Sequence, residues 1–578
     1  MTAATPSHGR ISIGQHLINR LHEAGLRRLY GVPGDFNLEF LELLVKDGRI
    51  SWIGCCNEMN AAYAADGDAR LSGFGAVLTT YGVGDLSALQ AVAGARAECV
   101  PVLSLAGLPP LNAVDNRFPL HHTLLNGDYE DVRAAYRPYT ASQGRVEAHN
   151  AAEVIDRAIT DVFQQKVPAY LQLPCDLCDV TIPTPRTPLA LDLPESDPGT
   201  LAMVTSALAG KISQARQGIV LVDALVARYG LEEQVMDFIT RTGLPYALLP
   251  TSRTVLERNH PLYRGIYNGR ASVPAAPGFD LDSYVAGADC VVGVGTRLFE
   301  FSTGFFSAAI QSGAWCNVEP YGLRHGFATP ALGKGKVVTG ARMGDILRAT
   351  AQALPAPKAA SGPAPKRTLP PLATDKAAWN GAVFWNRIAH FLRPEDGIFT
   401  DMGTCSANLA AVDLPEGARF NIQTIWAAIG YATPAVMGQQ MASLGLGEKR
   451  RHVLFTGEGA FQLTAQEIST MMRHHLNPVV FVINNRGYTV ERCILGEHAP
   501  FNDVAPWRYA ALPKALGEEG RSQSFEVRDQ QELEVALAAA ENPSKLTLIE
   551  VHLEPLDAPE GLWKMGKAIA DMDYSRSV

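Results

Sequence analysis

The chain has 578 residues, 47% of them hydrophobic and 19% charged, and its formal net charge is −9. At about 100–200 residues per domain, this length predicts several domains with ample hydrophobic core. An acidic chain with no block of lysine and arginine lacks the basic surface that nucleic acids and anionic membranes require, so we expect neither as a partner. No apolar run reaches the roughly 18 residues of a membrane span.

The N-terminal segment 1–14 carries no apolar run of signal-peptide length. The chain holds nine cysteines, an odd number, and in the absence of a secretion signal we expect reduced thiols and a cytoplasmic protein. Cys175 and Cys178 form a CxxC pair, but no second pair or histidine follows at metal-ligand spacing. We therefore interpret these two residues as core or loop thiols.

The first third of the chain alternates helical and strand-like patterns. Residues 11–26 have apolar side chains at helical spacing, whereas 75–82 and 100–107 are continuous apolar runs typical of buried strands. A proline-rich stretch, 181–198, follows and predicts an extended linker.

The middle third shows the same alternation. The runs 218–226 and 288–296 are predicted strands followed by glycine or small residues, and a second proline-rich linker spans 355–371. The glycines in 293–295 fall short of a full GxGxxG fingerprint, which argues against dinucleotide binding. We expect this part to be structural or regulatory.

The last third contains predicted strands at 451–457, 477–485 and 545–553, separated by helical segments. Continuous apolar strands that alternate with helices indicate mostly parallel sheets covered by helices on both faces. We therefore predict an α/β fold in three domains. The predicted domains are 1–187, 188–365 and 366–578. Ligands of such sheets bind beyond the carboxyl ends of the strands, so we expect the functional residues in the loops that follow strands.

The most informative loop is 457–460 (Gly-Glu-Gly-Ala), which leads into a helix predicted to begin near Phe461; the next strand ends in 484–487 (Asn-Asn-Arg-Gly). Glycines let backbone N–H groups approach an anion, and a helix N-terminus favours negative charge. Glu458 and Asn485 would supply oxygen ligands at neighbouring strand ends, which suits Mg²⁺ beside phosphates. For Gly-Glu-Gly alone, a tight turn with a solvated glutamate is the simpler interpretation.

This pattern resembles the motif of the thiamine-diphosphate enzymes, which begins Gly-Asp-Gly and closes nearly thirty residues later with a double asparagine. The resemblance implies that Mg²⁺ is held by Glu458, Asn485 and the backbone carbonyl of Gly487, and that Gly459 and Ala460 contact the cofactor. Glu458 stands where the family usually has aspartate. Because glutamate is one methylene longer and Mg²⁺ is strict about geometry, we expect the change to affect metal affinity more than metal identity.

Four further motifs resemble those of the pyruvate and indolepyruvate decarboxylases, in the same order and over essentially the whole chain. They are 31–37 (GVPGDFN), 57–58 (NE), 120–123 (LHHT) and 487–491 (GYTVE). The resemblance implies a non-oxidative decarboxylase that converts a 2-oxo acid to an aldehyde and carbon dioxide through a thiamine diphosphate ylide and an enamine, with the cofactor as electron sink.

The same resemblance assigns roles to the ionisable residues. Glu58 would hydrogen-bond the aminopyrimidine and favour the tautomer that forms the ylide. Protons of the later steps and the substrate carboxylate would be handled by Asp35, His121, His122 and Glu491. Taken singly, each of these residues is explained as well by a turn, helix-cap, surface or packing role, and only the set favours catalysis.

Two segments of the third domain resemble other cofactor contacts. Thr404 follows a predicted strand at 397–402 and would meet the pyrimidine. Ala427 and Ala428 precede Ile429, which matches the bulky residue that holds the cofactor in its bent shape. Core packing is the alternative role for Ile429.

The substrate pocket is predicted to be wide. Ser406 and Ala407 occupy positions where pyruvate-specific relatives carry large aromatic residues, and Val490 and Ile494 would form an apolar wall. Because an apolar pocket discriminates by only about 1–3 kcal/mol per methylene, we expect aromatic or branched 2-oxo acids to be accepted besides pyruvate. Other aromatic side chains could refill the space; the candidates are Phe301 and Phe461.

Asp35 and Glu58 belong to the first predicted domain and the diphosphate loop to the third. In the family these domains come from different subunits, which implies a homodimer with active sites at its interface, and dimers that pair into tetramers.

Two alternative functions remain: a carboligase similar to acetolactate synthase, and a non-catalytic protein that binds the cofactor. The histidine pair and Glu491 argue against the first, and the complete set of proton-handling residues argues against the second. A nicotinamide-dependent enzyme is more remote, and the sequence leaves the physiological 2-oxo acid open.

Overall fold

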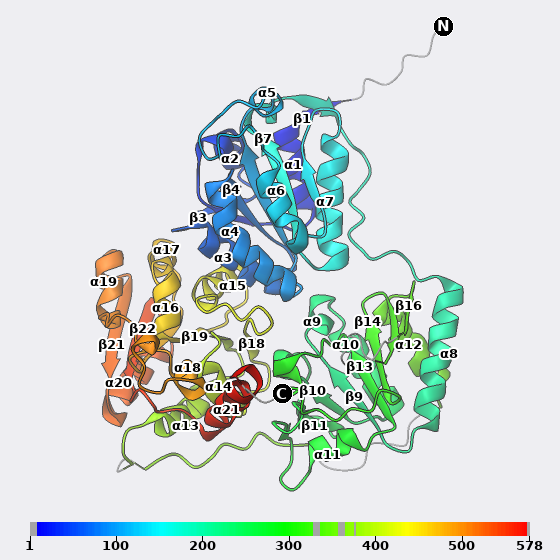
Figure 1. Ribbon diagram of the computed structural model, residues 1–578, viewed down its shortest axis with the longest axis vertical. Helices are drawn as coiled ribbons and strands as arrows, with labels where there is room; N and C mark the ends of the chain where they lie inside the picture. The colour runs from blue at the N-terminus through cyan, green and yellow to red at the C-terminus, as the bar shows by residue number, and fades with distance from the viewer. Residues whose placement is uncertain (1–8, 327–335, 356–363, 375–376, 575–578) are drawn as a thin grey trace.

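The computed structural model describes residues 9–326, 336–355, 364–374 and 377–574, so part of the predicted linker 355–371 lies outside the described residues. The chain forms three α/β domains, each around its own sheet (Figure 1). The N-terminal domain lies at the top of the view, the middle domain at the lower right and the C-terminal domain at the lower left. Among the described residues, no helix is both long and apolar enough to cross a bilayer.

The N-terminal domain is built on a fully parallel sheet with the order β3-β2-β4-β5-β7-β6. Its strands are β2 Arg28–Gly31, β3 Ser51–Gly54, β4 Gly75–Thr80, β5 Val102–Leu108, β6 Gln143–Arg145 and β7 Ala169–Pro174. Its helices are α1 Ile13–Glu23, α2 Leu38–Asp47, α3 Glu58–Ser72, α4 Val83–Ala97, α5 Leu111–Asp115, α6 Asp131–Tyr136 and α7 Ala151–Gln165. The apolar runs predicted as strands form β4 and β5, which are buried on both faces as a parallel sheet requires.

The middle domain has a mixed sheet, β12-β11-β10-β9-β13-β14-β15-β16, that is parallel from β11 to β14 and antiparallel at both ends. Its strands are β9 Gly218–Val222, β10 Tyr246–Leu248, β11 Tyr263–Ile266, β12 Val273–Pro274, β13 Cys290–Val294, β14 Trp315–Glu319, β15 Gly322–His325 and β16 Lys336–Thr339. Its helices are α8 Pro198–Gln214, α9 Leu225–Arg228, α10 Glu232–Thr242, α11 Leu281–Ala286 and α12 Met343–Ala353. The predicted strand 218–226 is too long, because the buried side chain of Asp223 accepts a hydrogen bond from the backbone of Ala224 and turns the chain into α9.

The C-terminal domain again has a fully parallel sheet, with the order β18-β17-β19-β20-β22-β21. Its strands are β17 Gly397–Thr400, β18 Arg419–Asn421, β19 His452–Gly457, β20 Val479–Asn484, β21 Ser522–Val527 and β22 Leu546–His552. Its helices are α13 Gly381–Phe391, α14 Thr404–Ala411, α15 Ala432–Gly445, α16 Glu458–Thr464, α17 Glu467–Arg473, α18 Thr489–Ile494, α19 Leu512–Leu516, α20 Gln530–Ala540 and α21 Glu560–Tyr574. The helix expected near Phe461 begins at Glu458 instead, because Gly457 is still extended and acts as its N-cap.

Two short strands, β1 and β8, form a separate small sheet. Strand β8, Thr181–Pro183, pairs antiparallel with β1, Arg10–Ser12, so the first linker begins as part of a small sheet.

All nine cysteines are free thiols, and Cys175 and Cys178 are half-buried and buried, respectively. Burial raises the pKa of Cys175 to about 11 and that of Cys178 to about 12, as expected for unreactive packing thiols. The cytoplasmic location stays a prediction.

The N- and C-terminal domains of one chain pack tightly through α3 and α15 (Figure 1). A Cβ atom on Gly67 would lie 2.0 Å from the carbonyl oxygen of Ala435, and one on Gly438 would lie 1.9 Å from that of Ala64. Glycine at both positions therefore lets the two helix backbones approach each other directly. A single hydrophobic cluster runs through both domains at this contact.

Candidate active site

Glu458 is the first residue of α16, directly after β19 at the carboxyl end of the C-terminal sheet. Its side chain is buried, and its Oε1 accepts a hydrogen bond of 2.6 Å from the backbone N–H of Gly487. Burial raises the pKa of Glu458 to about 7. In the described parts of the chain Glu458 forms no ion pair, so this carboxylate lacks the cation that a buried charge requires.

The side-chain amide of Asn485 tests whether a metal ion fits here. One end of the amide lies 2.9 Å from the carbonyl oxygen of Gly487 and 3.3 Å from Oε1 of Glu458, and the other end lies 2.8 Å from Oγ1 of Thr489. With its nitrogen toward the two acceptors, Asn485 donates hydrogen bonds to both. With its oxygen toward them, three oxygens converge, an arrangement that a bound cation stabilises. These are the hard ligands that Mg²⁺ prefers, so the residues fit the metal.

The backbone around these ligands is held in conformations that favour glycine. A Cβ atom on Gly459 would lie 2.3 Å from the ring of Tyr488, and one on Gly487 would lie 2.2 Å from the carbonyl oxygen of Asn502. Gly487 also has φ +144, and the preceding Arg486 has φ +62. The two loops can therefore close around a small bound group only with glycine at both positions.

Most of the predicted cofactor, metal, catalytic and substrate-pocket residues of the C-terminal domain line one cavity. They are Thr404, Ile429, Glu458, Gly459, Ala460, Asn485, Gly487, Val490 and Glu491. Ala427 and Ala428 lie in the segment that leads to Ile429. Ser406, Ala407 and Ile494 are half-buried but are not among the described residues that line this cavity in one protomer. The hydroxyl of Ser406 instead caps α14: it donates to the carbonyl oxygen of Gly403 at 2.9 Å and accepts from its N–H at 3.1 Å.

Asp401 is a positioning residue that the sequence analysis did not identify. It is buried, and it accepts hydrogen bonds from the backbone N–H groups of Gly430 at 3.0 Å and Ala432 at 3.1 Å and from the hydroxyl of Thr456 at 2.7 Å. Burial raises the pKa of Asp401 to about 6. These contacts fix the backbone just after Ile429. An aspartate directly after a buried strand was the available signal.

The segment before Ile429 is held in a strained conformation. Ala427 has φ +56, which is uncommon for a residue with a side chain. The backbone N–H of Ala428 donates to Oε1 of Gln423 at 3.3 Å, and that of Ile425 donates to Oε1 of Glu98, from the N-terminal domain, at 2.7 Å. Strain that the surroundings enforce is characteristic of functional segments.

The predicted acid–base residues of the N-terminal domain meet at the carboxyl end of its sheet. Nε2 of His121 lies 3.0 Å from Oδ2 of Asp35, and the rings of His121 and His122 are 4.4 Å apart. Phe36 stacks on His121 at 5.0 Å and meets His122 edge-on at 6.2 Å. The side chains of Asp35 and His121 are 50% and 57% exposed, so this group is open to solvent in one protomer.

Glu58 begins α3, directly after β3, at the same end of that sheet. A Cβ atom on Gly84, in the first turn of α4, would lie 3.3 Å from Oε1 of Glu58, so the carboxylate rests against that helix. The cavity around Glu458, in contrast, is lined only by residues of the C-terminal domain among those the structure describes. The predicted site residues therefore form two separate groups in a single chain.

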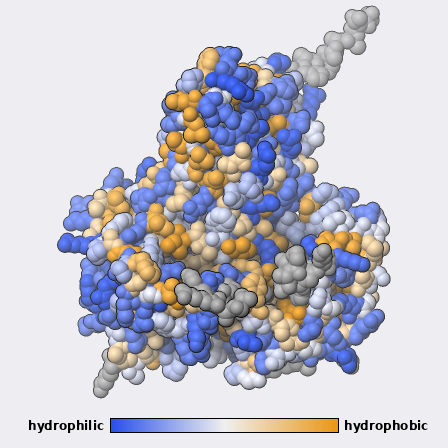
Figure 2. Space-filling view, in the orientation of Figure 1, coloured by the Kyte–Doolittle hydropathy of each residue, from blue (hydrophilic) through white to orange (hydrophobic). Residues whose placement is uncertain are grey.

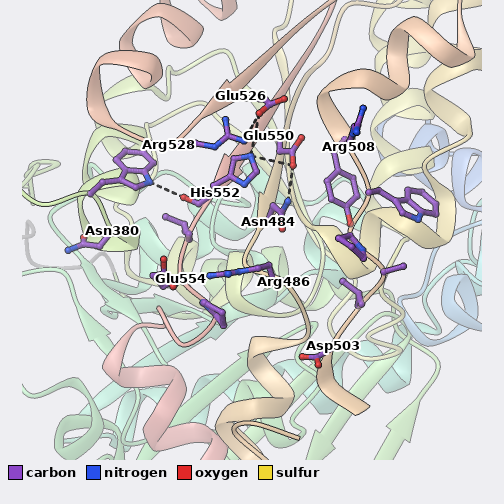
Figure 3. Close-up of a pocket in the computed structure, with 18 of the residues that line it drawn as sticks. Asn380, Asn484, Arg486, Asp503, Arg508, Glu526, Arg528, Glu550, His552 and Glu554 are labelled. Atoms are coloured by element: carbon purple, nitrogen blue, oxygen red, sulfur yellow. Dashed lines mark hydrogen bonds and ion pairs between the residues drawn. The ribbon is translucent and has the colours of Figure 1, made fainter. Parts of the chain in front are cut away.

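A larger cleft of about 1060 Å³ lies beside the loop 484–487, at the carboxyl ends of β20, β21 and β22 (Figure 3). Asn484 faces this cleft, where its Nδ2 donates to Oε1 of Glu550 at 2.7 Å. Nε2 of His552 lies 3.4 Å from Glu550 and 3.9 Å from Glu526. The double asparagine is thus divided between two sites, because successive strand residues point to opposite sides: Asn484 supports the cleft, and Asn485 faces Glu458.

Three family models match the chain. The one described as "Thiamine pyrophosphate enzyme, N-terminal TPP binding domain" matches residues 11–130, "central domain" matches 205–315 and "C-terminal TPP binding domain" matches 401–551. The cavity at Glu458 lies inside the last of these matches. Fold and site together define a thiamine pyrophosphate enzyme, as the sequence predicted.

Relatives place the chain more narrowly. An "Alpha-keto-acid decarboxylase" of Mycolicibacterium paratuberculosis (strain ATCC BAA-968 / K-10) is 37% identical over 554 residues, 95% of each chain. A "Pyruvate decarboxylase" of Aspergillus fumigatus (strain ATCC MYA-4609 / CBS 101355 / FGSC A1100 / Af293) is 34% identical over 569 residues, 97% of each chain. The crystal structure of benzoylformate decarboxylase from Polynucleobacter necessarius matches in fold, with a TM-score of 0.76 at 18% identity, over 95% of this chain and 99% of that one. The chain belongs to the thiamine-diphosphate-dependent 2-oxo acid decarboxylase family.

Proposed function

We propose that this enzyme converts 2-oxo acids to aldehydes and carbon dioxide with thiamine diphosphate and Mg²⁺ bound at the Glu458 cavity. The observation that carries the metal assignment is the position of the Asn485 amide, 2.9 Å from the carbonyl oxygen of Gly487 and 3.3 Å from Oε1 of the buried Glu458, so that three oxygen ligands can surround one ion. Family membership supports the reaction class, and the intact acid–base group of the N-terminal domain supports activity over a purely binding role.

The residues that would hold the cofactor follow from the cavity lining. Glu458, Asn485 and the Gly487 carbonyl would bind Mg²⁺, and Ile429 and Thr404 would contact the organic part. When bound, thiamine diphosphate supplies the electron sink that loss of carbon dioxide requires. Asp401 keeps the backbone after Ile429 in place, which preserves the shape of this contact.

The acid–base group would move the one proton that the reaction consumes: a 2-oxo acid anion and a proton yield an aldehyde and carbon dioxide. Asp35 and His121 are 3.0 Å apart, close enough to share a proton, and His122 lies beside them. Glu491 enters from α18 on the other half of the site. Groups that deliver protons in this way typically contribute factors of about 10²–10⁴ in rate.

The two halves require a second copy of the chain, which we infer forms a homodimer with shared active sites. Exposed apolar side chains surround the histidine pair: Phe118 is 45%, Leu124 75% and Leu125 65% exposed. Leu463 on α16 and Leu495 after α18 are 46% and 55% exposed near the cavity. Figure 2 shows apolar surface along the flank of the N-terminal domain that descends toward the C-terminal domain. Such surface usually marks an interface. Pairing of dimers into tetramers stays a prediction.

Few aromatic side chains line the cavity at Glu458, which is the feature that a substrate pocket open to bulky side chains requires. Tyr488 is the single aromatic residue among the described lining residues, and Val490 contributes apolar wall. The ring of Phe461 is buried 6.2 Å from that of Tyr509, and Phe301 packs among middle-domain aromatics, so neither refills the cavity. We propose that aromatic and branched 2-oxo acids are accepted besides pyruvate.

Aldehyde formation, coupled to an alcohol dehydrogenase, tests the proposal. Pyruvate, phenylpyruvate and indolepyruvate are compared after reconstitution with thiamine diphosphate and Mg²⁺. We expect turnover that needs both cofactors, falls by about 10²–10⁴ in Glu58→Gln and persists in Glu153→Gln, a glutamate in the first turn of α7. Acetolactate as the main product, or cofactor binding without any aldehyde, would overturn the assignment.

A further inference from the structure

The group formed by Asp35, His121 and His122 has a second chemical property: it can chelate. One possible ligand atom from each residue lies within 4.8 Å of the other two, and this is the one such group of histidine, cysteine and carboxylate side chains in the described chain. We propose that these three residues form an inhibitory site for a divalent transition-metal ion such as Zn²⁺, distinct from the Mg²⁺ site at Glu458.

The ligand set fits zinc chemistry. Two imidazole nitrogens and one carboxylate oxygen, with water at the fourth position, make an open tetrahedral site. Bonds of about 2.0–2.2 Å place neighbouring ligand atoms roughly 3.3–3.5 Å apart, and Nε2 of His121 and Oδ2 of Asp35 already lie 3.0 Å apart. The wider separations, up to 4.8 Å, must shorten by about 1.4 Å when an ion binds. The side chains of Asp35 and His121 are 50% and 57% exposed in a single chain, which leaves them room for a movement of this size.

The backbone prepares this arrangement before any ion arrives. His122 has φ +61, a left-handed conformation that brings its ring next to that of His121. The loop lies so close to Gly82 that a Cβ atom there would be 2.1 Å from the carbonyl oxygen of His122. Phe36 packs against both imidazoles and limits their rotation. Ligands held in place in this way lose less conformational entropy when they bind.

Two contrasts within the chain sharpen the inference. The Glu458 site offers only oxygen ligands, which suit Mg²⁺, whereas the histidine site offers nitrogen, which favours Zn²⁺ and its neighbours. The chain has another adjacent pair, His474 and His475, whose neighbours are cationic: Arg521 hydrogen-bonds Nδ1 of His475, and Arg473 precedes the pair. That pair belongs to no ligand group in the described chain and serves as an internal control.

An ion at this site would occupy the lone pairs that the proposed function assigns to proton transfer. Bound Zn²⁺ would therefore lower turnover without displacing thiamine diphosphate or Mg²⁺. This consequence rests on the proposed function, but the binding site itself does not. Binding and inhibition are accordingly measured separately.

The test uses the full chain saturated with thiamine diphosphate and Mg²⁺. Zn²⁺ affinity is measured by calorimetry, and Co²⁺ is used as a visible-absorption probe of nitrogen ligation. We expect one high-affinity ion per chain, with affinity reduced at least about tenfold in both His121→Gln and Asp35→Asn and unchanged in the double variant His474→Gln/His475→Gln. Equal affinity in all variants, or no Zn²⁺ binding by the unaltered protein, would overturn the proposal. Binding without loss of turnover would retain the site and reject its inhibitory role.

Discussion

The Glu458 loop and the Asp35 loop both follow parallel strands, yet the first is buried and the second is exposed to solvent in a single chain. Glu458 is 1% exposed and its pKa is raised to about 7, whereas Asp35 and His121 are half exposed. The first loop is closed by neighbouring strand ends of its own domain. The second faces solvent amid exposed leucines. The proposed cofactor-binding residues are therefore enclosed within a single chain, whereas the proposed acid–base residues are open to solvent.

The strongest test of this contrast uses two inactive variants together. Glu58→Gln damages the N-terminal half and Glu458→Gln damages the C-terminal half, and we expect each alone to lose about 10²–10⁴ in rate. If sites form between chains, a mixed dimer contains one site with both residues intact, so co-expression should restore roughly a quarter of the activity. The measurement is aldehyde formation by the mixed preparation. Sites formed within one chain would show no recovery.

A buried carboxylate of the N-terminal domain gives a pH-dependent stability. Asp85 is fully buried, accepts a 2.7 Å hydrogen bond from Tyr170, and burial raises its pKa to about 7. Its pKa in the folded protein lies above the ordinary value of 3.8. The contribution of Asp85 to the free energy of unfolding is therefore complete at low pH and is lost as pH rises through about 7. We expect Asp85→Asn to remove up to about 4 kcal/mol of this pH dependence.

The measurement is the unfolding midpoint of the cofactor-free protein at several pH values between about 4 and 8. Asp179→Asn, at an exposed aspartate of the same domain, is the matched control. Parallel curves for the unaltered protein and Asp85→Asn would contradict the expectation.

The metal loop can be tested by the length and charge of one side chain. Glu458→Gln keeps the size but removes the charge, and we expect Mg²⁺ affinity to fall by about 10–100-fold. Glu458→Asp keeps the charge and should retain binding, since the ligand oxygens remain. Both are measured by Mg²⁺ titration of cofactor-dependent fluorescence. An unchanged affinity in Glu458→Gln would remove this residue from the ligand set.

The smallest expected effect concerns substrate choice. A large residue at 407 should narrow the pocket, so Ala407→Phe is expected to lower kcat/KM for phenylpyruvate relative to pyruvate by roughly tenfold. The ratio is measured with both substrates under identical cofactor saturation. An unchanged ratio of the two kcat/KM values would show that Ala407 does not form the pocket wall. That outcome would agree with the described cavity lining of a single chain, which does not include Ala407.

Much of the architecture could be predicted because it depends on local patterns. Continuous apolar runs predicted β4, β5, β13, β19, β20 and β22, since strands of a parallel sheet are buried on both faces. Glu458 and Asn485 could be paired from the sequence because the carboxyl ends of neighbouring parallel strands share an edge. The start of α16 and the end of β9 were missed because capping depends on a few backbone hydrogen bonds.

Other parts of the site depend on contacts between residues far apart in the chain. Asp401 is identified by the hydrogen bonds that it accepts from Gly430 and Thr456. The strained segment around Ala427 is anchored by the backbone N–H of Ile425, which donates to Glu98, more than three hundred residues away. The sequence by itself determined the three-domain α/β fold and the family, because strand patterns and short motifs are local. Only the tertiary structure decided that Asn484 supports the large cleft, how α3 and α15 meet, and that Asp401 holds the backbone after Ile429, because those outcomes depend on packing over the whole molecule.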